Sequence, residues 1–597
     1  MSDQIPDDPA GREHFSTLTF DNVGRDSLPV ESETSPPGRP ASRGIVEFNQ
    51  DCYLEAYPDL AGAIETGQFT SARAHYLHSG RSANWLSQES YLKLLAGGVS
   101  QRAAHGAMSF SIDVAIASHT GTLFVVGWTD DRETPLISVS AIQGSEGWNT
   151  RGIVRCRRAD VEQVLQSPIG HSYGFWLVHE LGQFDAQGVI MLRARFADGR
   201  FTQLELKPRV VSDVDLRETA LGHFSSLQYL GNREIESAQQ LESGVGNELV
   251  ALNRSISRAL TAAAHVERYG PTRARFDASF IVCLFGKHEY FFLQNALFAP
   301  GADTENVEFV YVSNSPELTE ALQKEAQIAE RIYGISLTLV TLPGNAGFSA
   351  ANNVAAKFAR SERLVFINPD VFPRDDGWAR LHREIIETKP PAQTKLFGGL
   401  LYYDDGSLMH GGMYFEIDRG LSVKPTEIQG RNLIRVEHYG KGAPDWSTRY
   451  TQERPVPAVT GAFISADRNW FELLGGFTED YLFGHYEDAD LCLKSLQNGG
   501  PAWIHDIRFW HLEGKGSVRR PPHEGGSLVN RWLFTRNWGK TIEDSLVGRA
   551  PSHPLLDSES DGTFTTPAPM AAADDGLSVS AQLISQATPN PELTVTR

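Results

Sequence analysis

Residues 364–373 read LVFINPDVFP, in which four apolar side chains pass directly into Asn, Pro and Asp. A short apolar run without alternation predicts a buried parallel strand. Ligands of open α/β sheets bind just beyond the carboxyl ends of such strands, so Asp370 is expected where a metal or a phosphate is bound. The alternative is that Pro369 and Asp370 form only a turn that caps the following helix. The segments on either side favour the ligand site.

Strands and helices alternate from residue 278 onward. The patterns SFIVCLF, VEFVYVSNS, ISLTLVTL and RLVFI predict strands, and KHEYFFLQNALFA, PELTEALQKEAQIAERIYG and FSAANNVAAKFARS predict helices. Such alternation indicates right-handed βαβ units and a mostly parallel, Rossmann-like sheet. The polar residues that follow its strands should therefore meet at one edge.

Three further segments are expected at that edge. Asn314 ends the second strand, where a polar side chain can meet a base or a ribose. Residues 344–353, GNAGFSAANN, have small side chains that allow close approach of a ligand, and the helix that begins there favours an anion. This loop is neither a Walker loop nor a GxGxxG fingerprint. The third segment carries the acids Glu487, Asp488 and Asp490, followed by His505 and His511; a solvated helix start is the alternative explanation of these acids.

Length and composition limit the class of protein. A chain of 597 residues has room for three to five domains. A formal charge of -20 argues against binding nucleic acid, and no window predicts a transmembrane segment. The acidic start lacks the features of a secretory signal, so we expect a cytoplasmic protein, with peripheral attachment to the inner face of the membrane as an alternative. The four widely spaced cysteines indicate buried free thiols.

The first 270 residues divide into four parts by pattern. Residues 1–44 are rich in Pro, Ser, Asp and Gly and are expected to be disordered, as are residues 549–597. Residues 45–104 have the spacing of a small helical module, and 105–211 alternate as in an all-β sandwich without helices. Trp128 and Trp176 are candidates for sugar stacking there, although a core position is the commoner role. Residues 212–270 predict a helical connector, leaving 271–548 as the catalytic domain.

The catalytic segments resemble one enzyme family. Residues 279–539 are similar to the family 2 inverting glycosyltransferases of the GT-A fold, in particular the bacterial rhamnosyl- and galactofuranosyltransferase-like branch of cell-surface polysaccharide synthesis. The resemblance rests on GNAGFSAANN, FINPDV, VTGAFISADRNWFELLGGFTEDYLFGHYEDADLCLK, FWHLEGKGS and VNRWLFTRNWGK. Four or more motifs in the family's order form a specific signal, although any one of them alone is weak.

The resemblance implies roles for individual residues. Asp488 would be the general base that takes the proton of the acceptor hydroxyl, and Glu487 would position it or meet the acceptor. Asp370 and His511 would bind Mn²⁺ or Mg²⁺, which neutralises the leaving diphosphate. The remaining positions fall into two groups: donor-binding Asn314, Asn345, Gly347, Asn353, Asn368 and Asp370, and acceptor-binding Gly461, Tyr486 and Glu487.

Two departures from the family pattern affect recognition of the nucleotide. Leu284 to Lys287 stand where relatives have a Thr-Tyr-Asn type stretch, and Asn314 stands where many have an Asp. UDP-linked and dTDP-linked donors both remain open, as do hexosyl and deoxyhexosyl groups, and so does homo-oligomer formation.

The expected function is transfer of a sugar to a hydroxyl of a glycan or lipid-linked acceptor. The alternatives are a glycan-binding scaffold with an inactive transferase domain, or a sugar nucleotidyltransferase.

Overall fold

The computed structural model describes residues 101–545, with gaps at 106–107, 144–145, 150–152, 168–169, 182–184, 186–187, 230–232, 274, 299–305, 389, 392, 419–432 and 513–519. The segments expected to be disordered, 1–44 and 549–597, lie outside the described residues. The same is true of Cys52 and of the helical module up to residue 100.

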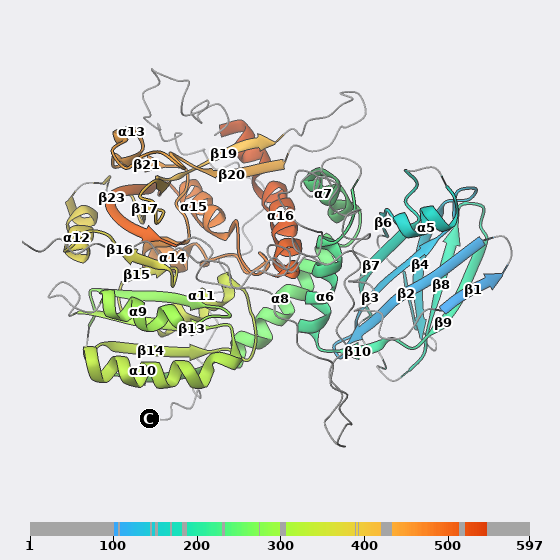
Figure 1. Cartoon of the computed structure of the whole chain (residues 1–597), viewed down its shortest axis with the longest axis horizontal. Coiled ribbons are helices and arrows are strands. Elements are labelled where there is room, and N and C mark those ends of the chain that lie inside the picture. The colour runs from blue at the N-terminus through green and yellow to red at the C-terminus, as the bar shows by residue number, and fades with distance from the viewer. Residues whose placement is uncertain are drawn as a thin grey trace, which may run out of the picture. The chain divides into compact units, whose positions relative to one another are not determined.

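Two β-sheets make up residues 101–211 (Figure 1). One has the order β1-β2-β3-β7-β6 with β10 beside β2, and the other has the order β5-β4-β8-β9. A core that includes Phe110, Val125 and Leu192 lies between them. The bounds are β1 Gln101–His105, β2 Met108–Ser118, β3 Thr122–Thr129, β4 Leu136–Gln143, β5 Glu146–Asn149, β6 Val154–Cys156, β7 Gly174–Glu180, β8 Ile190–Phe196, β9 Phe201–Leu206 and β10 Arg209–Val211.

Details of this region differ from the expectation. Residues 101–104 belong to strand β1 rather than to a helical module, because they pair with β2. A short helix, α5 (Ala159–Val164), interrupts the strands. Trp176 is fully buried, with its ring against Phe124 and Phe224, so it cannot stack on a sugar. Trp128 is half-buried.

The connector consists of α6 (Asp213–Ser225), α7 (Arg233–Ser243) and α8 (Gly246–Ala262). Leu216 and Phe224 of α6 share one apolar cluster with Phe124 and Trp176 on the outer face of the six-stranded sheet. The connector does not remain helical to residue 270, because β11 (His265–Tyr269) pairs antiparallel with β14 of the next sheet. A domain boundary at residue 271 would cut this strand from its sheet.

The central sheet has the strand order β11-β14-β13-β12-β15-β22-β17-β23-β16, with β18 beside β17 and β21 beside β23. Neighbours from β14 to β15 run parallel, whereas β22 is antiparallel to both β15 and β17. The sheet is therefore mixed rather than mostly parallel. The bounds are β12 Ala278–Leu284, β13 Val307–Ser313, β14 Ser336–Thr341, β15 Arg363–Ile367, β16 Val371–Pro373, β17 Leu396–Tyr402, β18 Leu408–His410, β21 Arg454–Val456, β22 Phe463–Asp467 and β23 Ala502–His511.

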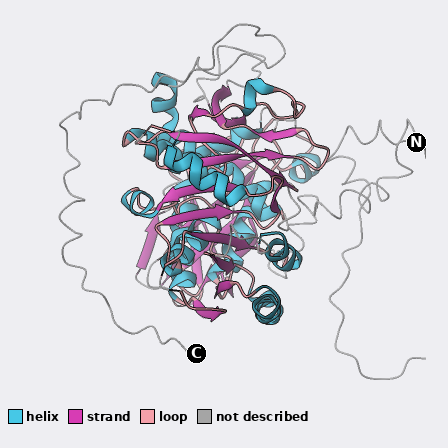
Figure 2. Ribbon diagram, turned by 90° about the vertical axis from the view of Figure 1, so that its left-hand side faces the viewer, coloured by secondary structure: helices cyan, strands magenta, loops and turns pink. Residues whose placement is uncertain are grey.

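Helices cover both sides of this sheet (Figure 2). Side chains of α9 (Glu289–Phe298) and α10 (Thr319–Tyr333) join one apolar cluster, and α11 (Phe348–Phe358) joins the other. The remaining elements are η3 Pro316–Leu318, α12 Trp378–Thr388, β19 Met413–Asp418, β20 Leu433–His438, α13 Thr448–Thr451, α14 Arg468–Leu473, α15 Glu487–Gln497 and α16 Pro521–Ser545. None of the helices in the described ranges combines the length and apolar character that a membrane crossing requires.

His223 lies in the contact between the six-stranded sheet and α6. Its ring packs against Phe124 and Trp176, and neither ring nitrogen has a hydrogen-bond partner in the described residues. Burial lowers the pKa of His223 from 6.5 to about 3, and the charge of Arg158 adds to this effect. The imidazole is therefore neutral when the contact is formed.

Replacing His223 with Phe should make folding less sensitive to acid. The unfolded chain binds a proton at His223 below about pH 6.5 and the folded chain does not, so stability is lost as pH falls from 6.5 toward 3, by up to about 1.4 kcal/mol per pH unit. Urea unfolding of both proteins at several pH values between 7 and 4.5 measures the difference. His223→Phe should unfold at a higher midpoint at pH 5; parallel pH profiles would contradict the assignment.

Candidate active site

Asp370 and His511 lie side by side at the end of the central sheet. After β15, residues 368–370 form a turn, and β16 then pairs antiparallel with the end of β23, with Val371 opposite His511. Nε2 of His511 is 3.5 Å from Oδ1 of Asp370, and the two residues are 5% and 2% exposed. Because β16 separates Asp370 from α12, the helix-capping alternative for Asp370 is wrong.

This pair fits a divalent cation. Metal bonds of about 2.0–2.2 Å, at tetrahedral or octahedral angles, separate neighbouring donor atoms by about 3.0–3.5 Å. Nδ1 of His511 is buried without a hydrogen-bond partner in the described residues, and Nε2 is the nitrogen that faces the carboxylate. Within the same residues no group of three His, Cys, Asp or Glu side chains forms a metal site. The other coordination positions would thus be filled by ligand or water oxygens.

The turn that carries Asp370 is fixed from two sides. Nε2 of Gln294 donates to the carbonyl of Asn368 at 2.9 Å, and the hydroxyl of Tyr311 donates to Oε1 of Gln294 at 3.1 Å. The amide of Asn368 donates to the carbonyl of Ala462 at 3.0 Å. The half-buried side chain of Asn368 therefore sits on a rigid backbone beside Asp370.

The turn before the acidic segment is strained. Phe483, His485 and Tyr486 have φ angles of 58°, 82° and 77°, in the left-handed region that residues other than glycine rarely adopt. Each such residue costs about 1–3 kcal/mol and persists only where its surroundings hold it. Strain of this kind concentrates at functional sites, which makes this turn a candidate independently of any motif.

Asn530 of α16 holds the strained turn. Its Oδ1 accepts from the amide of Leu482 at 2.7 Å. Its Nδ2 donates to the carbonyls of Leu482, Gly484 and His485 at 2.9, 2.7 and 3.2 Å. Asn530 is fully buried, so these bonds are shielded from water. The sequence placed Asn530 in a closing motif but gave it no role.

The two adjacent acids have opposite environments. Glu487 is buried, and Oε2 of its carboxyl has no partner in the described residues. Burial raises the pKa of Glu487 well above its ordinary value, and the negative charge of Asp488 raises it further, so the environment disfavours the ionised form of Glu487. Asp488 is half-buried; its Oδ2 accepts from the amide of Gly461 and its Oδ1 from that of Ala489, both at 2.8 Å. Of the two, Asp488 is the more exposed carboxyl.

Residues 460–462 connect Asp488 to the Asp370 turn. The amide of Gly461 binds Asp488, and the next carbonyl, of Ala462, binds the amide of Asn368. Tyr486, the other residue expected to meet the acceptor, precedes α15 and packs on Phe534, with ring centroids 5.2 Å apart. Burial raises the pKa of Tyr486 to about 12, so its hydroxyl stays protonated.

Asp490 and His505 support the structure. Asp490 accepts hydrogen bonds from Thr478, Tyr481 and Trp538, which joins α15 to α16. Nδ1 of His505 accepts from the amide of Ile507, and Nε2 therefore carries the proton toward His382, 3.0 Å away. Neither residue faces the pair of metal-ligand candidates.

Two of the expected donor-binding side chains are occupied by the protein itself. Asn314 accepts from the amide of Ala346 through Oδ1 and donates to the carbonyl of Gly347 through Nδ2. Asn353 accepts from the amide of Phe477 and donates to its carbonyl and to Glu479. These amides hold loops in place, which gives both residues a positioning role; their contact with a donor stays a prediction.

The loop around Gly347 is close to the catalytic turn. Oδ1 of Asn345 accepts from the amide of Gly347, whose φ of 87° suits glycine. A Cβ at Gly347 would lie 3.3 Å from the amide nitrogen of Phe483, and the amide of Phe348 donates to the carbonyl of Phe483 at 2.7 Å. Asn345 and Gly347 thus shape the start of α11 and bring it against the turn before Glu487.

Arg217 of the connector supports the same two loops. It is fully buried and donates to Oδ1 of Asn253 and to the carbonyl of Asn345, both at 2.8 Å. Its guanidinium lies 4.6 Å from the centroid of the Phe483 ring. Burial lowers the pKa of Arg217 to about 10, so the charge is retained at neutral pH. No sequence pattern marked this residue.

Comparison with known proteins gives partial similarities. No family model matches the chain. The uncharacterized protein y4gI of Sinorhizobium fredii is 27% identical over 209 residues, which is 35% of this chain and 21% of that protein. The O-antigen biosynthesis protein RfbC of Myxococcus xanthus is 29% identical over 134 residues, which is 22% of this chain and 10% of that protein. The matched part spans only a fifth and a tenth of these relatives.

Two solved structures share 15% sequence identity with the chain. The crystal structure of GalNAc-T7 with UDP, GalNAc and Mn²⁺ has a TM-score of 0.33, and the match covers 47% of this chain and 52% of the GalNAc-T7 chain. The mannosyltransferase PcManGT from Pyrobaculum calidifontis, in complex with GDP-Man and Mn²⁺, has a TM-score of 0.28. The match covers 53% of this chain and 87% of the mannosyltransferase chain. These scores are too low to assign any residue of this chain.

Replacing Asn530 with Ala should loosen the strained turn. The change leaves the buried amide of Leu482 without an acceptor, which typically destabilises by about 1–3 kcal/mol. We expect amide hydrogen exchange in residues 480–490 to become roughly 10- to 100-fold faster. Mass spectrometry of the intact folded chain measures this.

Asn498→Ala is the matched control, because Asn498 is exposed and donates only to the carbonyl of Lys494 through its side chain. Exchange in residues 480–490 should be unchanged in this variant. Equal exchange in Asn530→Ala and the wild type would show that Asn530 does not hold the turn.

Proposed function

We propose that this chain is an inverting, metal-dependent GT-A glycosyltransferase. It moves a hexosyl or deoxyhexosyl group from a UDP- or dTDP-linked donor to a hydroxyl of a glycan or lipid-linked acceptor in cell-surface polysaccharide synthesis. The observation that carries the proposal is the convergence of two unlike groups at the end of the central sheet. Asp370 and His511 form a buried pair 3.5 Å apart, and Asp488, a half-buried carboxylate, is joined to the Asp370 turn through residues 461–462.

The residues fit the two halves of a displacement reaction. A divalent cation held by Asp370 and His511 would neutralise the charge that develops on the leaving diphosphate. Asp488 takes the proton of the acceptor hydroxyl as its oxygen bonds to the anomeric carbon. The bond from that carbon to the phosphate oxygen breaks at the same time, and the electron pair leaves with the nucleoside diphosphate. Attack from the opposite face inverts the anomeric configuration.

The different environments of Glu487 and Asp488 support this division of roles. A general base must be deprotonated and in contact with its substrate. Glu487 is buried, and burial raises its pKa, which makes it the poorer candidate for an ionised base. Asp488 keeps oxygen lone pairs beyond those used by Gly461 and Ala489, because each carboxylate oxygen has two. We therefore assign the base to Asp488 and a positioning role to Glu487.

A glycan-binding scaffold with an inactive transferase domain is the competing proposal. An inactive domain has no need of a strained turn that costs several kcal/mol in front of Asp488. Incubation with a panel of nucleotide sugars and Mn²⁺, with released UDP or dTDP as the signal, separates the two. Release that depends on the protein supports the transferase, and binding of glycans without release supports the scaffold.

Asp488→Asn should abolish transfer, because the amide has no free carboxylate to take the proton. General base catalysis contributes typically about 100- to 10,000-fold, so at least a 100-fold loss of kcat is expected. Binding of UDP or dTDP with Mn²⁺, measured by calorimetry, should stay within a few-fold, since the base acts only on the acceptor.

Asp404→Asn provides the control for the same chemical change at an exposed turn. It should keep wild-type turnover and binding. Retention of a tenth or more of the wild-type rate by Asp488→Asn would remove Asp488 from the role of base.

Asp370→Ala and His511→Ala should each weaken metal-dependent nucleotide binding, by at least about tenfold, together with turnover. Each change removes one of two protein ligands from the same ion. His505→Gln is the matched control on the same strand, because His505 bonds to Ile507 and His382 instead. It should lower thermal stability while leaving the Mn²⁺ dependence unchanged. Full turnover of the wild type in excess EDTA would contradict the metal assignment.

A further inference from the structure

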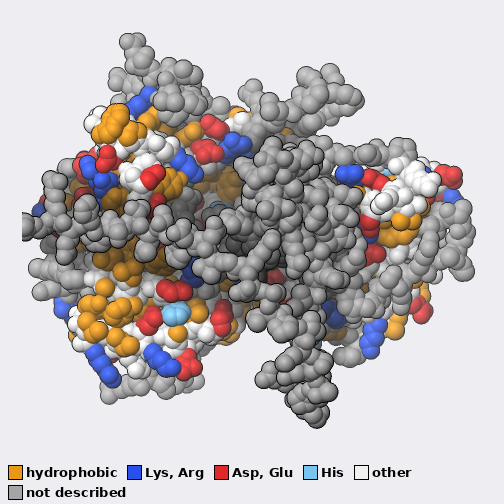
Figure 3. Space-filling view, in the orientation of Figure 1, with side chains coloured by type: hydrophobic (Ala, Val, Ile, Leu, Met, Phe, Trp, Pro, Cys, Tyr) orange, Lys and Arg blue, Asp and Glu red, His pale blue; other side chains and the backbone are white. Residues whose placement is uncertain are grey.

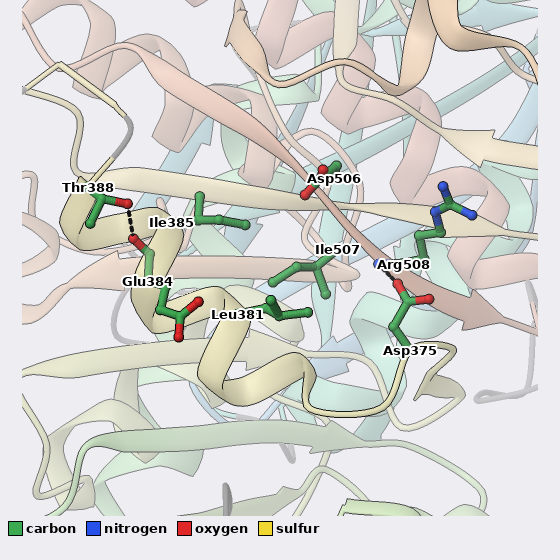
Figure 4. A pocket seen from close by; sticks show the side chains of 8 residues that line it. All are labelled: Asp375, Leu381, Glu384, Ile385, Thr388, Asp506, Ile507 and Arg508. Atoms are coloured by element: carbon green, nitrogen blue, oxygen red, sulfur yellow. Dashed lines mark hydrogen bonds between the residues drawn. The ribbon is translucent and has the colours of Figure 1, made fainter.

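A cavity of about 530 Å³ lies between α12 and β23 (Figure 4). Leu381, Ile385 and Ile507 form the apolar part of its lining. Asp375, Glu384, Asp506 and Arg508 add charged groups to the lining, and Thr388 adds a hydroxyl. Polar and charged side chains thus make up most of the lining beside an apolar patch, and the volume is in the usual range for sites of small organic ligands.

The cavity is separate from the proposed catalytic residues but shares their strands. Ile507 and His511 are four residues apart on β23, or roughly 13 Å at the rise of a strand. On the neighbouring side, Asp375 follows β16, the strand that begins directly after Asp370. A ligand that extends along β16 and β23 from the catalytic end would reach this cavity.

An exposed tryptophan is connected to the same place. Trp446 is 79% exposed, which is unusual for the largest apolar side chain. The neighbouring Asp445 forms an ion pair with Arg374 at 3.0 Å, and Arg374 directly precedes Asp375 of the cavity. Figure 3 shows hydrophobic side chains exposed over α13, the helix that begins at Thr448.

Arg374 is itself held in a fixed position. Its guanidinium lies 4.5 Å from the ring centroid of Tyr402 and 4.6 Å from that of Trp510, the residue next to His511. Its amide donates to the carbonyl of Arg508. Tyr402 is also within electrostatic range of Asp445 on the loop side and of Asp375 on the cavity side. Arg374 thus connects Asp445 of the loop, through an ion pair, to Asp375 of the cavity, its neighbour in the chain.

The loop that presents Trp446 is ordered by its own backbone. The amide of Gly442 donates to the carbonyl of Leu408, and the amide of Leu408 donates to the carbonyl of Ala443, at 2.8 and 2.7 Å. The amide of Ser447 closes a turn onto the carbonyl of Pro444 at 3.0 Å. A tryptophan on a fixed loop loses little conformational freedom when a ligand covers it.

We propose that Trp446 and the α12–β23 cavity form an accessory subsite for the sugar chain of the acceptor, away from the hydroxyl that reacts. This proposal rests on the proposed glycosyltransferase function. Sugar rings present an apolar face, which stacks on an indole, and hydroxyls at their edges, which bind carboxylates and guanidinium groups. Trp446 supplies the indole, and Asp445, Asp506 and Arg508 supply the polar partners. The subsite holds a long acceptor in register without touching the reacting atoms.

Binding of glycans to the full chain tests the subsite without requiring turnover. The probe is an array of bacterial surface oligosaccharides of defined sequence, and the best binder is then titrated by calorimetry. Trp446→Ala should weaken binding about tenfold, the effect of about 1.4 kcal/mol of aromatic contact. Trp446→Phe, which keeps an aromatic face, should stay within about threefold, and Asp506→Asn should weaken binding as well.

Leu473→Ala is the matched control, because Leu473 is a 69% exposed apolar residue on α14. It should bind the array as the wild type does. Wild-type protein that binds no oligosaccharide, or Trp446→Ala that binds as tightly as wild type, overturns the subsite. If the only effect of Trp446→Ala is to convert a dimer to a monomer in light scattering, the surface is a contact between copies of the chain. That outcome also overturns the subsite.

Measurements of turnover distinguish failure of the subsite proposal from failure of the proposed glycosyltransferase function. With a short acceptor, Trp446→Ala should keep the wild-type kcat and KM, and with a long acceptor its apparent KM should rise about tenfold at unchanged kcat. Nucleotide release on a short acceptor together with unchanged KM on a long one overturns the subsite alone. No release from any donor with any acceptor overturns the proposed transferase, whatever the array shows.

Discussion

The backbone of residues 483–486 is the constraint on which the candidate site depends. Three residues in the left-handed region raise the free energy of the fold by roughly 3–9 kcal/mol, a sum comparable to the stability of an ordinary domain. The turn persists because separate elements hold it. Asn530 binds it from α16, the amide of Phe348 binds it from α11, and Arg217 covers the ring of Phe483 from α6. These contacts fix the position of the start of α15, which carries Asp488.

Arg217 packs the connector against the loops of the candidate site. It binds the loop at Asn345 and the ring of Phe483, while Ser257 of α8 binds the carbonyl of Ala346. The strand β11 extends the central sheet, so the polypeptide before residue 271 supplies both a sheet edge and the support of the active-site loops. The boundary expected at residue 271 therefore falls between β11 and β12, two strands of one sheet. The motifs mark the candidate site residues, but not which residues hold them in place.

Local patterns predicted the parts of the structure that depend on neighbouring residues in sequence. The apolar run at 364–367 forms β15, Gly334 ends α10 in a left-handed conformation, and Asp370 follows the strand end as expected. Contacts between distant residues were not predictable in this way. The sequence did not show that Asn314 and Asn353 bond to backbone groups of residues 346–347 and 477. Arg217 and Gln294 gave no signal, since each acts on a loop that is distant in sequence.

The acids at the start of α15 illustrate how burial gives adjacent carboxyls different environments within a common pattern. Acidic residues in the first turn of a helix are ordinary, because the helix dipole favours them. Here the strained turn points Glu487 into the interior, where burial raises the pKa of its carboxyl, and leaves Asp488 half-exposed on the backbone amides of Gly461 and Ala489. The two carboxyls therefore have different environments although they are adjacent in sequence. The order of the residues alone does not determine which carboxyl is buried; the conformation of residues 483–486 does.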